Sequence, residues 1–258
     1  MLDKLTAISN ASFLGKLLRL PFRLMPDSAT LPVLSGINRG MKWIAGSATH
    51  GAWLGTYESD KQQQLVRLLK PGMAFYDVGA NAGFYTLAAA RLVGERGHVF
   101  AFEPLAENVA NLRRHVQLNQ LQNVSIVQAA VADTQSLSGF NVAPSRAMGS
   151  LSEGADYWVP TVSLDQAIAS YGLLPPDVIK LDVEGAESRV LAGAEALLRA
   201  GKATWLIALH GDAQRTQCLN VLQSYGYRVH RVDGIALEAL LPDERMVDEI
   251  VAFPPGAN

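Results

Sequence analysis

The stretch Asp77–Thr86, D-V-G-A-N-A-G-F-Y-T, places one acid and two glycines between a short apolar run and a helical pattern. A strand followed by a tight turn and a helix start can hold an anion or a cofactor. Glycine lets the backbone approach a ligand closely, and the first helical turn offers unpaired N–H groups. We predict that Gly79, Asn81 and Gly83 form such a loop. A purely structural glycine turn is the alternative.

Asp77 narrows the choice of ligand for this loop. A dinucleotide-binding loop would read G-x-G-x-x-G after the strand, whereas this chain has Gly79-Ala-Asn81-Ala-Gly83. A carboxylate two residues before the first glycine would repel a pyrophosphate. Asp77 instead suits the ammonium group of an amino acid, or it braces the loop through backbone N–H groups.

A second signal lies at the end of the apolar stretch His98–Glu103, H-V-F-A-F-E. Glu103 follows Gly83 by 20 residues, where an acid at a strand tip can accept hydrogen bonds from ribose hydroxyls. Asp133 follows a third apolar stretch and suits either an adenine amino group or a plain turn. Together these residues predict a nucleoside-containing cofactor, against the alternative of solvent-facing strand ends.

Ionisable residues also follow two later strands. Lys180, Asp182 and Glu184 cluster after one apolar run, and His210 ends another. The carboxyl ends of parallel strands meet at one edge of a sheet, where ligands bind. His210 is therefore the best candidate base, with a hydrogen-bonded structural histidine as the alternative. Asp182 with His210 or Asp212 offers ligands for a divalent metal, but their spacing does not establish a metal site.

The elements that must position these residues alternate between strand and helix. This order predicts an α/β, doubly wound, mostly parallel sheet. Asp233-Gly234 indicates a closing hairpin that makes one edge antiparallel. The stretch 135–156 has no clear period and is interpreted as an insertion that covers the substrate. The predicted strands are 74–78, 98–103, 124–130, 157–162, 178–182, 203–210, 227–232 and 249–253, and the main predicted helices are 61–69, 84–92, 105–119, 164–171, 187–200 and 213–225.

Composition excludes several classes of protein. The 258 residues are 49% hydrophobic and 18% charged, which is typical of one globular α/β domain with additions. A formal net charge of -2 argues against a nucleic-acid partner. The single cysteine, Cys218, excludes an internal disulfide and a cysteine-cluster zinc site, which fits a reducing, cytoplasmic location.

Residues 1–30 stand apart from the alternating pattern. Apolar residues near one helical face are interrupted by Lys16, Arg19 and Arg23, which argues against a signal peptide. The favoured interpretation is an amphipathic helix that caps the main domain. The alternative is peripheral contact with a membrane or a lipid-linked substrate. Farther along, Tyr57 and Glu58 precede the first long strand and are weaker candidates for contacting the cofactor.

Three motifs in order resemble the FkbM family of S-adenosylmethionine-dependent methyltransferases. They are D-V-G-A-N-A-G-F-Y-T (Asp77–Thr86), A-F-E-P-L-A-E-N (Ala101–Asn108) and I-K-L-D-V-E-G-A-E (Ile179–Glu187). G-T-Y-E (Gly55–Glu58) and S-Y-G-Y-R-V (Ser224–Val229) are similar too. The resemblance implies a class I methyltransferase (Rossmann-like) domain over residues 50–258, preceded by a helical extension over residues 1–49.

The resemblance also implies roles for individual residues. Asp77, Gly79, Asn81 and Gly83 would face the methionine part of S-adenosylmethionine. Glu58, Glu103, Asp133 and Asp182 complete the cofactor-binding set, with Glu103 at the ribose and Asp133 near the adenine. His210, Asp182 and Glu184 form the expected catalytic set.

The implied reaction is O-methylation of a hydroxyl on a sugar, glycolipid or secondary metabolite. One departure matters, because the family often has an acid two residues before this histidine and the chain has Ala208. A non-catalytic binding domain therefore stays open as an alternative. A nicotinamide-dependent oxidoreductase is a weaker one, since G-x-G-x-x-G is missing.

Overall fold

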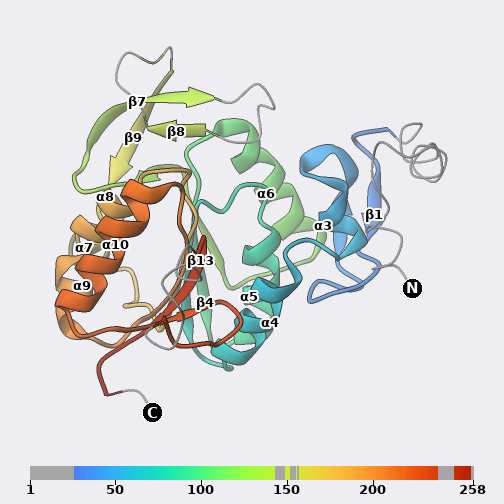
Figure 1. The fold of residues 1–258 in the computed structure, drawn as a ribbon. Helices are drawn as coiled ribbons and strands as arrows, with labels where there is room; N and C mark the ends of the chain where they lie inside the picture. The colour runs from blue at the N-terminus through green and yellow to red at the C-terminus, as the bar shows by residue number, and fades with distance from the viewer. Residues whose placement is uncertain (1–25, 143–148, 152–154, 156, 238–246, 257–258) are drawn as a thin grey trace, which may run out of the picture.

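A seven-stranded sheet forms the centre of the molecule in a computed structural model, which describes residues 26–142, 149–151, 155, 157–237 and 247–256 (Figure 1). The strand order is β12-β13-β11-β10-β3-β4-β5. The strands are β3 (Ala74–Val78), β4 (His98–Phe102), β5 (Val124–Val127), β10 (Val178–Leu181), β11 (Thr204–Ala208), β12 (Arg228–Arg231) and β13 (Glu249–Phe253). The pairs along β11-β10-β3-β4-β5 are all parallel, which confirms the predicted mostly parallel α/β fold.

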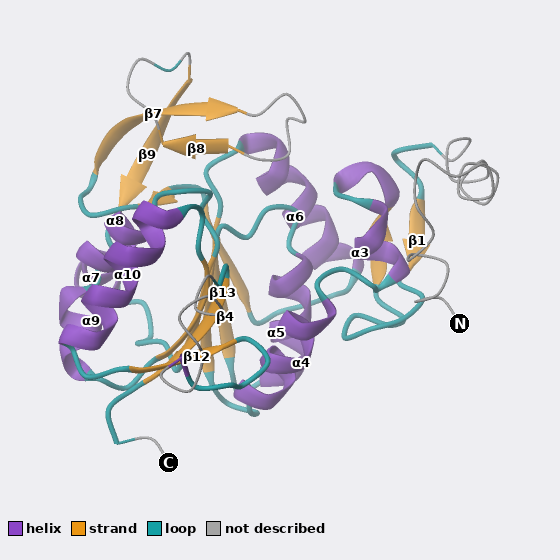
Figure 2. Ribbon diagram, in the orientation of Figure 1, coloured by secondary structure: helices purple, strands orange, loops and turns teal. Residues whose placement is uncertain are grey.

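Helices cover both faces of this sheet (Figure 2). One face carries α4 (Ser59–Leu68), α5 (Phe84–Val93) and α6 (Ala106–Leu118). The other carries α7 (Leu164–Tyr171), α8 (Glu187–Ala192), α9 (Glu195–Ala200) and α10 (Asp212–Ser224). The doubly wound arrangement follows from these two layers.

The residues of β3 explain why both faces must be covered. All five are buried, and successive side chains of a strand point to opposite faces. Phe75 packs with Leu87 of α5 in one core cluster, whereas Tyr76 packs with Trp205 of β11 in another. Each fully buried side chain of this size contributes about 1.5–3 kcal/mol to folding, so β3 is stable only between two helical layers.

The closing hairpin forms at the predicted edge of the sheet. β13 runs antiparallel to both β11 and β12 and lies between them, so β12 is the outermost strand. At the predicted turn, the Gly234 N–H donates to the Arg231 carbonyl at 2.8 Å, with a Gly234 φ of +95°. The positive φ explains why glycine occupies this position.

Several predicted elements can be compared closely with the structure. α7, β13 and β9 (Tyr157–Val162) begin and end at the predicted residues. The single helix predicted over 187–200 is instead two helices, α8 and α9, with a break at Gly193 and Ala194. A Cβ atom on Gly193 would lie 2.2 Å from the Ala132 carbonyl oxygen, so the backbone passes the segment around Ala132 too closely for a side chain.

The region 135–156 differs from its prediction, because part of it is regular structure. β7 (Ser136–Val142) and β8 (Gly149–Leu151) join β9 (Tyr157–Val162) and β6 (Ala130–Val131) in a second sheet of order β6-β9-β7-β8. β7 pairs antiparallel with both β8 and β9. The serine- and glycine-rich sequence hid these strands, because only scattered side chains such as Phe140 are buried.

The expected helical extension over residues 1–49 has strands where the structure describes it. Residues 1–25 lie outside the described part. β1 (Thr30–Pro32) pairs antiparallel with β2 (Lys42–Ile44), and the turn η1 (Ala45–Ser47) and helix α3 (His50–Leu54) follow. Among the described helices, none combines the length and apolar character needed to cross a bilayer. The interpretation of residues 1–30 as a membrane contact stays a prediction.

His115 of α6 fastens this N-terminal hairpin to the domain. Its ring stacks on Trp43, and its Nε2 accepts the Ile44 N–H at 3.0 Å. Its Nδ1–H donates to the Ala82 carbonyl at 2.7 Å, in the loop after β3. These bonds need a neutral ring, and burial lowers the pKa of His115 to about 4. The hairpin and the loop after β3 are therefore held by one side chain.

Candidate functional site

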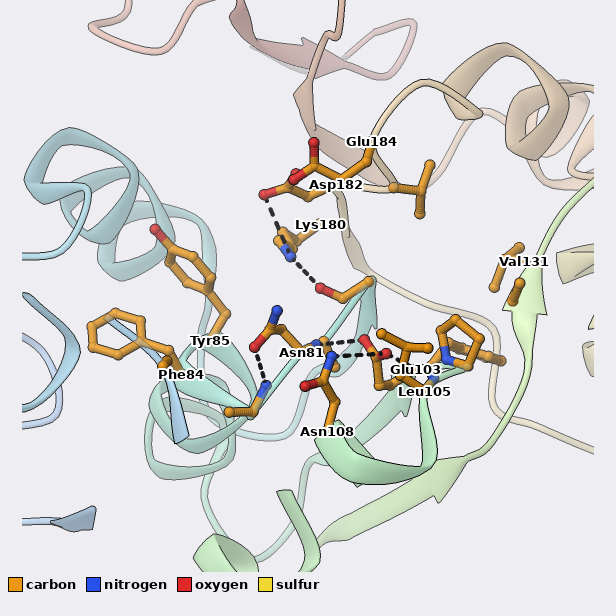
Figure 3. Close-up of a pocket in the computed structure, with 18 of the residues that line it drawn as sticks. Asn81, Phe84, Tyr85, Glu103, Leu105, Asn108, Val131, Lys180, Asp182 and Glu184 are labelled. Atoms are coloured by element: carbon orange, nitrogen blue, oxygen red, sulfur yellow. Dashed lines mark hydrogen bonds and ion pairs between the residues drawn. The ribbon is translucent and has the colours of Figure 1, made fainter. Parts of the chain in front are cut away.

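A cavity of about 250 Å³ opens at the carboxyl ends of β3, β4 and β10 (Figure 3). This is the edge at which open parallel α/β sheets bind ligands. Seven residues singled out from the sequence line the cavity, namely Tyr57, Gly79, Asn81, Glu103, Lys180, Asp182 and Glu184.

The loop after β3 has a left-handed backbone at three positions. Gly79 has a φ of +79°, and a Cβ there would lie 1.9 Å from the Asp182 carbonyl oxygen. Gly83 has a φ of +94° at the start of α5, where a Cβ would lie 2.2 Å from Leu112 Cδ1. Asn81 adopts a φ of +50°, which asparagine tolerates better than most residues. Gly79 is therefore required by close backbone approach as well as by conformation. At Gly83 the conformation is the main constraint, because the near atom is the end of a side chain.

Glu103 is bound on the protein side by three donors. Its Oε2 accepts the Asn81 N–H at 2.8 Å, and its Oε1 accepts the Leu105 N–H at 2.9 Å and Asn108 Nδ2 at 3.2 Å (Figure 3). Burial raises the pKa of Glu103, and these hydrogen bonds oppose that rise. Because a carboxylate oxygen accepts two hydrogen bonds, Oε2 can accept one more from a ligand hydroxyl.

Asp77 lies beneath the cavity and does not line it. Its side chain is wholly buried, its Oδ2 accepts the Thr86 hydroxyl at 2.6 Å, and its Oδ1 lies 3.4 Å from Lys180 Nζ. Lys180 also donates to the Gly79 carbonyl at 2.8 Å. The structure thus gives Asp77 a bracing position, through side chains rather than the backbone N–H groups considered above. Asp77 does not line the cavity, and its contact with a ligand ammonium stays a prediction.

Asp133 and Asp212 lie away from the cavity. Both Nε and Nη2 of Arg189 donate to Asp133 Oδ1, at 3.0 and 2.7 Å, on the exposed surface. Asp212 is largely exposed and pairs with Arg215. The prediction that Asp133 meets an adenine does not fit this placement, and neither does a metal site that joins Asp212 to Asp182. Both residues follow strands, but their side chains turn toward nearby arginines.

Apolar residues make the wall beyond Glu103. Ala129, Ala130 and Val131 follow β5, and Leu105 follows β4, and all four line the cavity. The opening between Glu103 and this wall suits a flat apolar ring next to a polar hydroxyl-bearing group.

The second sheet closes part of the cavity. Phe140 of β7 and Leu151 of β8 line it, and Phe140 packs with Ala130 and Val159 in a small core of its own. These two side chains bring the insertion to the cavity, and the expectation that it covers the substrate stays a prediction.

Asp182, Glu184 and His210 gather at the rim of the cavity. His210 Nε2 lies 3.4 Å from Glu184 Oε2 and 3.8 Å from Asp182 Oδ1. On the other side of the ring, His210 Nδ1 is hydrogen-bonded to Glu187 Oε1 at 2.8 Å, and the Glu187 side chain is wholly buried. The two acids line the cavity, whereas His210 stands behind them.

The charges at this rim shift two pKa values in opposite directions. The hydrogen bond to Glu187 raises the pKa of His210 above its usual value, against the effect of burial. Burial would raise the pKa of Asp182, but Lys180, Lys61 and His210 outweigh it and lower that pKa. Asp182 is therefore ionised at neutral pH.

Lys61 of α4 is a buried cation that contacts three carboxylates. Its Nζ lies 2.9 Å from both Glu58 and Glu249 and 3.5 Å from Asp182. Glu58 also accepts the Tyr85 hydroxyl at 2.7 Å and does not line the cavity, although its neighbour Tyr57 does. Glu58 thus holds Lys61 in this structure, and its contact with the cofactor stays a prediction.

Glu249 supplies an acid close to the position that Ala208 leaves without one. In the register of the sheet, Ala208 of β11 lies directly opposite Glu249 of β13. The Glu249 carboxylate reaches Lys61, which in turn contacts Asp182 at the rim. The departure at Ala208 therefore does not leave this end of the sheet without a carboxylate.

Sequence reasoning assigned no role to Lys61, Asn108, Phe140 or Glu187. Glu187 follows Glu184 by three residues within V-E-G-A-E, and that repeated acid was the signal that could have found it. Asn108 closes the A-F-E-P-L-A-E-N motif in the same way. Lys61 and Phe140 carried no signal, because their contacts are with residues distant in the sequence.

Comparison with known proteins identifies one family. The family described as "Methyltransferase FkbM domain" matches residues 77–229. A protein-L-isoaspartate O-methyltransferase of Methanothrix thermoacetophila is 36% identical over 59 residues, which is 23% of this chain and 28% of that protein.

Two solved structures are more distant. A methyltransferase FkbM from Methylobacillus flagellatus is 16% identical with a TM-score of 0.49, over 80% of this chain and 55% of that one. An S-adenosylmethionine-dependent O-methyltransferase from Thermotoga maritima is 17% identical with a TM-score of 0.46, over 78% and 67%. The chain thus spans about half of the FkbM structure, and these likenesses are too distant to indicate an activity.

Proposed function

The chain belongs to the FkbM family of S-adenosylmethionine-dependent methyltransferases, and we propose that it transfers a methyl group to a hydroxyl oxygen. One observation carries this proposal. A single cavity joins Glu103, which can accept a ribose hydroxyl, to Asp182 and Glu184, which lie beside a histidine. The donor and the group that loses a proton would therefore meet in one enclosed space.

Different groups of lining residues suit the adenine, the ribose and the methionine part of S-adenosylmethionine. Ala129–Val131 and Leu105 suit the adenine, and the free acceptor position of Glu103 Oε2 suits the ribose. The loop at Gly79 brings backbone close to the methionine part. The sulfonium and ammonium groups are both cationic, and the carboxylate of Asp182 attracts them electrostatically. Lys180 lines the cavity and holds the loop through the Gly79 carbonyl, whereas Asp77 lies beneath the cavity and pairs with Lys180.

The sulfonium methyl is already activated, so the protein mainly aligns the acceptor oxygen with it and removes one proton. The oxygen forms a bond to the methyl carbon as the S–C bond breaks, and S-adenosylhomocysteine leaves. We assign loss of the hydroxyl proton to the rim of Asp182, Glu184 and His210. His210 Nε2 must be unprotonated for this step, because only then does it offer a lone pair.

The acceptor is best described by chemical class. The class is a small-molecule, glycan or lipid-linked hydroxyl, as the family resemblance implies. Phe140 and Leu151 pack with Ala130 and Leu105, so they belong to the adenine end of the cavity. A cytoplasmic location and the absence of a nucleic-acid partner belong to the same proposal, supported by the single cysteine and the net charge of -2.

The alternative is a binding domain that keeps the fold without transfer. Its support was the missing acid at Ala208, and Glu249 opposite that residue weakens it.

The test uses S-adenosylmethionine labelled with ¹³C at the methyl group and a panel of sugar, glycolipid and polyketide alcohols. A methoxy signal in the product, with equimolar S-adenosylhomocysteine, is the expected result. Transfer to nitrogen, carbon or sulfur alone would overturn O-methylation. Cofactor binding without transfer to any alcohol would favour the binding domain.

A further inference from the structure

The rim contains three ligand-type atoms that surround a point without bonding to one another. His210 Nε2 lies 3.4 Å from Glu184 Oε2 and 3.8 Å from Asp182 Oδ1, and ligand atoms of all three residues lie within 4.8 Å of each other. These separations are longer than N–H···O hydrogen bonds. Two ligands on one ion at about 2.1 Å lie about 3.4 Å apart when the angle is tetrahedral. The two separations from His210 Nε2 therefore suit ligands of a common cation.

The other ring nitrogen of His210 is fixed by a buried acid. Nδ1 pairs with Glu187 Oε1 at 2.8 Å, and the same Oε1 accepts the Gly185 N–H at 2.9 Å. A carboxylate behind a histidine orients the ring and leaves Nε2 as the coordinating atom, as in carboxylate–histidine–metal arrangements.

Glu187 also provides a second, independent observation. Its Oε2 is buried and has no hydrogen-bond partner among the described residues. A wholly buried carboxylate with one unpartnered oxygen is costly unless positive charge lies nearby. A cation on His210 would supply that charge through the ring.

The two oxygens of Asp182 face different groups. Oδ2 lies 3.5 Å from Lys61 Nζ and 3.7 Å from Lys180 Nζ, whereas Oδ1 faces His210. The lysines thus orient this carboxylate and leave Oδ1 free to coordinate.

We propose that Asp182, Glu184 and His210 bind one divalent cation of the Mn²⁺, Co²⁺ or Zn²⁺ type at the rim of the cavity. One imidazole and two carboxylates suit these ions better than the all-oxygen sets that Ca²⁺ and Mg²⁺ prefer. Its role rests on the proposed function and refines it: with the lone pair of His210 Nε2 on the ion, the ion would activate the acceptor oxygen in place of the imidazole, and the hydroxyl proton would leave to solvent before methyl transfer.

The competing explanation is an ion pair in which a protonated His210 bridges the two acids. Such a pair needs no metal, so metal binding separates the two explanations. The test titrates the full chain, freed of metal by chelation, with MnCl₂ and separately with ZnCl₂ by calorimetry, with neither cofactor nor acceptor present.

We expect one ion per chain at micromolar Kd. Three variants should weaken binding at least tenfold: His210→Ala, Glu184→Gln, and Glu187→Gln, which acts only through the histidine. Glu184 is partly exposed, so its variant should fold even if the others do not. Asp133→Asn is the matched control, since its carboxylate lies off the cavity, and should bind like the parent.

No binding, or equal binding by parent and Glu184→Gln, would overturn the proposal. A failure of the proposed function would look different, because ion binding would persist while no alcohol is methylated. If methylation is observed, chelation should abolish it and Mn²⁺ should restore it. Full activity in chelator would contradict the ion's role at the acceptor.

Discussion

Among single residues, Glu103 and Asp133 offer the sharpest contrast. Both are acids after strands with a predicted cofactor role, yet only Glu103 lines the cavity. In Glu103→Gln, an amide NH₂ replaces an oxygen that now accepts backbone or Asn108 hydrogen bonds. We expect affinity for S-adenosylmethionine to fall at least tenfold, equivalent to about 1.4 kcal/mol. In calorimetry Asp133→Asn should match the parent, and a larger loss there would contradict the assigned cofactor position.

His210 carries the second residue-scale prediction. His210 Nε2 assists loss of the hydroxyl proton, as a base or as a ligand of the proposed ion, and it makes none of the cofactor contacts assigned above. His210→Ala should keep S-adenosylmethionine affinity and lower turnover by about a hundredfold. The control is His98→Ala, at the opposite edge of the sheet, where turnover should stay within about twofold. Parental turnover in His210→Ala would remove this residue from the mechanism.

At the scale of elements, the loop after β3 passes very close to the backbone that follows β10, at Gly79 and Asp182. Gly79 and Gly72 both have positive φ, +79° and +91°, but only at Gly79 would a Cβ meet another atom within 4 Å. Gly72→Ala should cost about 1 kcal/mol of unfolding free energy from conformation alone. Gly79→Ala should cost at least about 2 kcal/mol more and lose cofactor binding, as measured by urea unfolding and calorimetry. Equal costs for the two variants would show that the approach to Asp182 is not a constraint.

The attachment of the N-terminal hairpin to α6 should depend on pH. His115 stays neutral in the folded protein down to about pH 4, whereas the unfolded chain takes up the proton below about 6.5. Unfolding free energy should therefore fall by up to about 3 kcal/mol as pH drops from 6.5 to 4, and this contribution is complete above 6.5.

The measurement is urea unfolding of the parent and His115→Gln at several pH values between 7 and 4. The parent's advantage should shrink as the solution becomes more acidic. An advantage that stays constant over that range would mean that His115 does not stay neutral in the fold.

Elements were predictable where their pattern is local. α7 and β13 match their predicted bounds, since an N-cap serine or a short apolar run is visible in the sequence itself. β7 and β8 were not predicted from the sequence. Their few buried residues, such as Phe140, are buried by packing against β6 and β9, which no local pattern indicates. The side-chain directions of Asp77 and Asp133 were likewise invisible, because Lys180 and Arg189, which hold them, are more than 50 residues away.

At the scale of the whole molecule, Lys61 links α4, β10 and β13 through three acids. Replacing a buried cation leaves these carboxylates uncompensated. Lys61→Met should lower the unfolding free energy by about 3 kcal/mol, and adding Glu249→Gln should recover part of that loss. Urea unfolding of both variants measures these changes. A loss of unfolding free energy below about 1 kcal/mol for Lys61→Met would contradict the prediction, because exposed ion pairs contribute no more than that.

The central claim is that the cavity holds S-adenosylmethionine between Glu103 and Asp182. The most direct measurement is a calorimetric titration of the purified chain with S-adenosylmethionine, with NAD as the comparison ligand. We expect one site per chain with a micromolar Kd for S-adenosylmethionine and no detectable heat of binding for NAD. A folded sample that binds neither ligand, or that prefers NAD, would contradict it.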